Sequence, residues 1–169
     1  MAPAPAAEKP KQWGPVVIGL VGGIIALLGA VIPWTLVQSC AGALGIELCI
    51  SLPIPVPLGT LNPLLGIAPI LALLTALVGI VLLFLHKPMT GMVAGLMGIL
   101  SMLFGILFIV SFGGIETELL NLVGGGGSAS IRVGVSFGVY LTIIGGLILG
   151  IGGFMQWMKL KGSAAAPSA

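Results

Sequence analysis

Few residues in this chain are of types that do chemistry, and they do not form a catalytic set. Cys40 and Cys49 are the only cysteines, and His86 is the only histidine. A nucleophile needs a base within hydrogen-bond reach, but the topology derived below places His86 across the membrane from both thiols. Two thiols without a nearby histidine also make a poor zinc site. We therefore expect no enzyme, no cofactor and no bound metal.

Two further polar segments have only a superficial likeness to binding sites. Glu116 and Glu118 flank Thr117, a pattern more typical of a solvated rim than of a cation site. Gly124 to Gly127 precede Ser128 but lack the lysine of a phosphate-binding loop, so we interpret this run as a flexible linker. The net charge of +2, with no basic stripe, does not indicate a nucleic-acid partner.

The two cysteines fall in one predicted loop on the outer side of the membrane. That side is usually oxidising, so we predict a disulfide between Cys40 and Cys49. A disulfide that closes a loop this short would stabilise the fold by about 2–3 kcal/mol in the chain-entropy model. The alternative is that both are small apolar residues of an apolar loop.

The elements that carry these residues are membrane spans. Hydrophobic residues make up 58% of the chain and charged residues 6%, with a mean hydropathy of +1.28. A soluble globule of this composition would expose large apolar patches. Four stretches reach the roughly 20 residues that a helix needs to cross the bilayer. They cover residues 15–36, 63–85, 89–112 and 133–158, and we predict an all-α membrane fold, a four-transmembrane-helix bundle.

The ends of these spans carry residues suited to a membrane boundary. Trp13, Trp34 and Trp157 are predicted interface anchors, because an indole buries its ring in lipid and keeps its N–H in water. Pro15 and Pro63 suit a first helical turn. The transmembrane domain then covers 14–158, with outer loops 38–62 and 113–132, and the tails 1–13 and 159–169 are predicted to be disordered cytoplasmic segments.

The basic residues predict the orientation of the chain in the cell membrane. Lysines precede the first span, lie between the second and third, and follow the fourth, whereas Arg132 alone lies on the other side. The positive-inside rule therefore places both termini in the cytoplasm. The alternative is that the first span is a cleaved signal peptide, but its apolar run exceeds the usual h-region and offers no clean small-x-small cleavage site.

Two runs on the outer side alternate with a period of two, which indicates strands. Ile46, Leu48, Ile50 and Leu52 form the first run, and Ile131, Val133, Val135 and Phe137 form the second. The two runs could pair as a small extracellular sheet. The alternative for residues 131–137 is that they are the first turns of the fourth helix.

This layout resembles the claudin-type tetraspan family. Four spans, inside termini, the Cys40-x8-Cys49 spacing and Trp34 at the head of the loop carry the resemblance. It implies a small outer sheet over a helix bundle and self-assembly in adhesion or a barrier. The family's Gly-Leu-Trp element before its first cysteine is missing, since Thr35 to Ser39 separate Trp34 from Cys40. A shared topology does not by itself carry function.

Small residues recur at four-residue spacing in three spans and predict close helix contacts. We expect these contacts within the chain, and on at least one stripe also with another copy or another membrane subunit. The stripes are marked by Gly19 and Gly23, Gly91 and Gly95, and Gly146 and Gly150.

Three classes of function remain. The first is a non-catalytic structural or accessory subunit of the membrane, acting through helix–helix and outer-loop contacts. The second is a claudin-like adhesion or barrier protein. The third is a small oligomeric pore or carrier, although the spans contain no Asp, Glu, Lys or His in their interior to mark a pathway.

Overall fold

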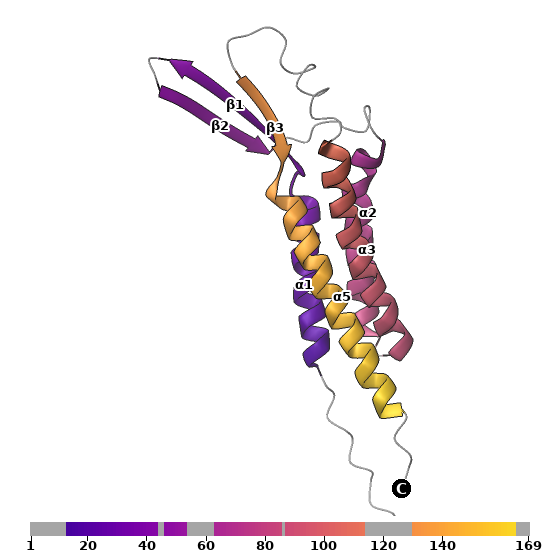
Figure 1. Ribbon diagram of the computed structural model, residues 1–169. Helices are drawn as coiled ribbons and strands as arrows, with labels where there is room; N and C mark the ends of the chain where they lie inside the picture. The colour runs from indigo at the N-terminus through magenta and orange to yellow at the C-terminus, as the bar shows by residue number, and fades with distance from the viewer. Residues whose placement is uncertain (1–12, 44–45, 54–62, 86, 114–129, 165–169) are drawn as a thin grey trace, which may run out of the picture.

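The computed structural model describes residues 13–43, 46–53, 63–85, 87–113 and 130–164, which form a four-helix bundle and a small sheet (Figure 1). The predicted fold class is confirmed. In chain order the elements are α1 (Gly14–Val31), β1 (Thr35–Ala43), β2 (Ile46–Pro53), α2 (Pro63–Phe84), α3 (Pro88–Gly113), β3 (Ser130–Val135) and α5 (Phe137–Ala164).

Each helix is long and apolar enough to cross a membrane, and α2 and α3 begin and end within one residue of prediction. α1 is shorter than predicted because it ends at Val31. The residue before a proline is restricted to extended backbone, and Ile32 before Pro33 has φ −68° and ψ 132°.

α5 differs from prediction at both ends. It begins at Phe137 because residues 130–135 form β3. Residues 131–135 of the alternating run are therefore strand, and Phe137, its last member, is the first residue of the helix. The helix continues to Ala164, so residues 159–164 are helical and not part of a disordered tail. Lys161 in its last turn is favourable for the helix dipole.

The four helices pack as a ring in which α1 and α3 each lie between α2 and α5. α2 and α5 are diagonal partners that meet at few points. The described chain starts and ends at the same end of the bundle, and the sheet stands at the opposite end (Figure 1). Large aliphatic side chains such as Val21, Ile70 and Leu147 remain exposed along the helices, as expected of a surface covered by lipid.

The sheet has the strand order β2-β1-β3, and both pairings are antiparallel. The two alternating runs are therefore strands of one sheet, but each pairs with β1 and not with the other. β1, which the sequence did not predict, occupies the centre. It begins at Thr35, two residues after the proline that ends α1.

Candidate functional site

The contact between α1 and α5 brings two backbones together. A Cβ atom added at Gly145 would meet the backbone N and Cα of Ala26, and one added at Gly29 would lie 2.5 Å from the Thr142 N. No real Cβ makes such a contact with a rigid backbone atom, so these positions need glycine. Van der Waals contact at this range can hold two helices together where lipid removes the hydrophobic driving force.

Every glycine of the three predicted stripes also lies against the protein's own chain. A Cβ at Gly19 or Gly23 would meet the α2 side chains Leu83 or Ile80. The α3 and α5 positions meet one another's helices. The nearest atom to an added Cβ would be Trp157 N at 2.9 Å for Gly91, Phe154 Cδ2 at 3.0 Å for Gly95, Gly98 O at 2.7 Å for Gly146 and Gly95 O at 3.5 Å for Gly150. The expected packing within the chain is therefore seen at all three stripes, and the expectation that one stripe also faces another chain stays a prediction.

Polar side chains inside the bundle bond to backbone carbonyls. Thr142 Oγ1 donates to Gly138 O at 3.0 Å, one turn back on its own helix, as is usual for threonine in membrane helices. Ser101 on α3 instead donates across the bundle to Ala72 O of α2 at 3.3 Å.

Gln156 on α5 is a buried polar residue that the sequence analysis did not single out. Its Nε2 donates to Leu83 O at 3.0 Å. Leu83 is the penultimate residue of α2, so its carbonyl has no intrahelical donor. Gln156 therefore satisfies this carbonyl and joins the two diagonal helices. Its Oε1 is buried and has no hydrogen-bond partner among the described residues. The sequence could have pointed to Gln156, since it is a polar residue within a predicted span.

Trp34 anchors the sheet to the bundle. Its Nε1 donates to Gly29 O at 3.0 Å. Pro33, one turn further on, cannot donate to this carbonyl because proline has no N–H. The Trp34 ring meets Phe108 edge-on, with 5.0 Å between centroids, and Phe108 stacks on Phe112. The Trp34 carbonyl accepts from the Ser136 N at 2.8 Å, so the residues just before β1 and α5 are bonded together.

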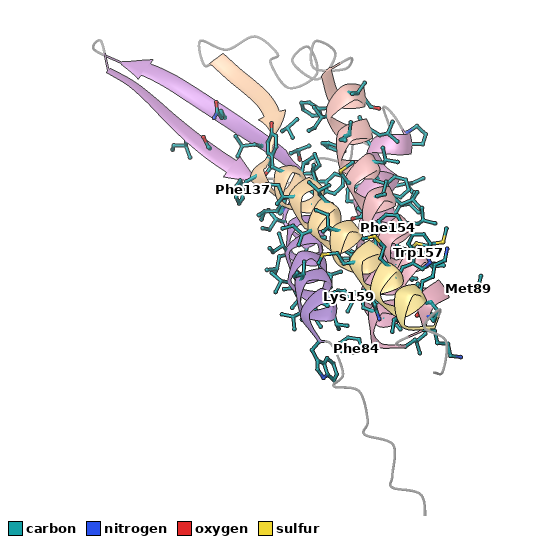
Figure 2. The ribbon with its side chains drawn as sticks, turned by 60° about the horizontal axis from the view of Figure 1, so that its bottom comes forward. Phe84, Met89, Phe137, Phe154, Trp157 and Lys159 are labelled. Carbon is teal, nitrogen blue, oxygen red and sulfur yellow. The ribbon has the colours of Figure 1, made fainter. Side chains whose placement is uncertain are left out.

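Trp34 is therefore not the interface anchor that the sequence predicted. Its side chain is only 4% exposed, and its N–H is bonded to protein instead of water, because the chain turns directly from α1 into β1. The other two predicted anchors lie at the end of the bundle away from the sheet. Trp13 is 48% exposed, and Trp157 is partly buried with the Lys161 Nζ 5.3 Å from its ring centroid. Figure 2 labels Trp157 and Lys159 on α5, toward the end of the bundle away from the sheet.

In the sheet, Cys40 of β1 lies directly opposite Cys49 of β2. Opposed residues of antiparallel strands have Cα atoms about 4.5–5.5 Å apart, within the range that a disulfide spans. His86, Glu116, Glu118 and Gly124 to Gly127 lie outside the described residues.

Four apolar helices with glycine contacts and internally bonded polar groups define an integral, multi-pass membrane protein. Neither a protein-family model nor a curated protein sequence matches the chain, so the claudin-like resemblance rests on topology.

Proposed function

We propose that this chain is a non-catalytic structural or accessory subunit of the membrane that binds its partners through the sheet. The single observation that carries the proposal is the sheet itself, anchored at Trp34 and standing beyond the bundle. The glycine faces, in contrast, are used within the chain. In such a subunit the helices pack against one another, and the sheet stands beyond them. The sheet is therefore suited to bind a partner outside the bilayer.

The orientation proposed is termini in the cytoplasm of a cell and sheet outside. Arg132 lies in β3, at the sheet end of the bundle. Lys87 lies in the α2–α3 connection and Lys159 and Lys161 near the end of α5, all at the opposite end. This distribution supports the positive-inside assignment.

β2 is the strand best placed for a partner. The strand order leaves one edge of β2 without a neighbour among the described strands, and such an edge offers unpaired N–H and C=O groups to another chain. Ile50 on β2 is 58% exposed and offers an apolar side chain on one face of the strand. A disulfide between Cys40 and Cys49 would hold β2 to β1 and keep this surface in shape.

A second candidate is a claudin-like adhesion or barrier protein that assembles with copies of itself. The observation that favours it is that β1 and β2 come from the segment between α1 and α2, whereas β3 precedes α5. One sheet thus joins both outer loops above a four-helix bundle, as the resemblance implies.

Extraction in mild detergent followed by mass analysis tests both candidates. Foreign chains that co-purify support the accessory subunit, and linear self-assembly supports the claudin-like protein. Ile50→Lys adds a charge to the β2 surface and should release the partner. Ser51→Lys is the matched control, because adjacent strand residues point to opposite faces. A wild-type chain recovered only as a monomer, with no other protein bound, would contradict both.

A further inference from the structure

A cavity of about 230 Å³ lies between the end of α1 and the first turns of α2. α1 contributes Ala30 and Val31 to its wall, and α2 contributes Gly66 and Pro69. Trp34 and Phe108 form the inner wall, where their rings are in edge contact. The cavity is therefore placed at the sheet end of the bundle, where α1 gives way to β1.

The cavity is continuous with the lipid-facing surface. α1 and α2 are neighbours in the ring of helices, so a gap between them opens outward to the bilayer. Val31, which lines the cavity, is 72% exposed. Both helices that meet at this opening are long and apolar enough to cross a membrane, so the surfaces around the opening are suited to hydrocarbon.

The chemistry of the wall fits an apolar chain better than a polar ligand. No wall residue is charged. The indole N–H of Trp34 is already bonded to Gly29 O, and Thr35 also has a partner of its own. An empty apolar cavity deprives its lining of van der Waals contacts, so filling it with hydrocarbon is favourable.

The size of the cavity suits part of one acyl chain. If each methylene takes about the 30 Å³ that a water molecule occupies in the liquid, the cavity has room for about eight. Gly66 has no side chain to fill the space from α2, and Pro69 stands inside that helix next to it.

We propose that this cavity holds the part of a phospholipid acyl chain nearest the headgroup, from a lipid in the leaflet on the side of the sheet. The lipid would lie against Trp34 and Phe108, the pair that anchors the sheet. The position of the sheet would then depend on the lipid that fills the space beneath it.

Trp34 provides the reporter for a test, because its buried ring forms part of the cavity wall. The full chain with Trp13→Phe and Trp157→Phe keeps Trp34 as its one tryptophan. It is reconstituted in phosphatidylcholine vesicles, either unlabelled or brominated on the upper part of one acyl chain. Bromine quenches tryptophan on contact, so we expect a loss of Trp34 fluorescence in the brominated vesicles.

Ala30→Leu fills the cavity and should restore the fluorescence, whereas Val21→Leu adds the same type of side chain to the lipid-facing surface of α1 and should not. Gly66→Leu fills the cavity from α2 if the first variant does not fold. Equal fluorescence in the two kinds of vesicle, or quenching unchanged by both filling variants, would overturn the proposal. So would quenching by acrylamide from the aqueous phase alone, which would mean that the cavity holds water.

Discussion

Replacing Gly145 by alanine adds one methyl group where α5 crosses α1. That methyl would meet the backbone N and Cα of Ala26 and would lie 2.7 Å from Gly22 O. None of these atoms can rotate away, so the two helices must separate. Gly150, further along the same helix, is a matched control, because its nearest atom would be Gly95 O at an ordinary 3.5 Å.

The comparison of these two variants isolates packing from helix propensity. Alanine is favoured over glycine inside a helix by about 1 kcal/mol at either position, so this gain cancels in the difference. Overpacking costs about 1–3 kcal/mol, and only Gly145→Ala incurs it. We therefore expect Gly150→Ala to be neutral or stabilising, and Gly145→Ala to be less stable than Gly150→Ala by about 1–3 kcal/mol.

The assay is reversible unfolding in mild detergent by titration with dodecyl sulfate, followed by tryptophan fluorescence and circular dichroism. Both variants should remain inserted and helical before the titration. If both unfold at the same dodecyl sulfate fraction, the backbone contact between α1 and α5 does not limit stability, and the reasoning from glycine geometry is refuted.

Three other predictions concern the hydrogen bond, the thiols and the orientation. Gln156→Met removes the bond to the end of α2 and should lower stability in the same titration by about 0.6 kcal/mol, the average for interhelical hydrogen bonds in a membrane protein, and by at most about 1.7 kcal/mol; unchanged stability would mean that the bond contributes nothing. Alkylation without reductant should leave Cys40 and Cys49 unmodified, and quantitative labelling of either would show that no disulfide forms. Cysteines introduced at Lys87 and Ser128, in a chain without the native pair, should label oppositely with an impermeant reagent in intact cells; labelling of both from outside would contradict the proposed topology.

The spans were predictable because an uninterrupted apolar run of about 20 residues is seldom anything but a membrane helix. The end of α1 was also within reach of the sequence, since Pro33 restricts the residue before it. β1 was missed because Thr35–Ala43 mixes Ser, Ala and Gly with apolar residues and lacks clean alternation. Its role as the central strand depends on pairing with β3, which comes after α3 in the chain, and local pattern does not encode such a distant pairing.

The glycine stripes show a different limit. Their spacing predicts that two backbones approach closely, but it does not say whose backbone is the second one. Only the arrangement of helices reveals that Gly146 of α5 meets α3 and that Gly145 beside it meets α1. Trp34 was misjudged for a related reason, because a tryptophan at the end of a span serves equally well as a boundary anchor or as the core of a helix–sheet junction.

The place of α5 at the centre of the glycine contacts has a consequence for biogenesis. Helices of a membrane protein can insert singly before they associate, and α5 is the last of the four to leave the ribosome. Until it arrives, the glycine faces of α1 and α3 that meet α5 have no partner, although α2 can already pack against both helices. The bundle can close only when synthesis of the final span is complete. A nascent chain stalled before Phe137 would therefore present two glycine faces to the surveillance machinery of the membrane, and a finished chain would present none of these faces.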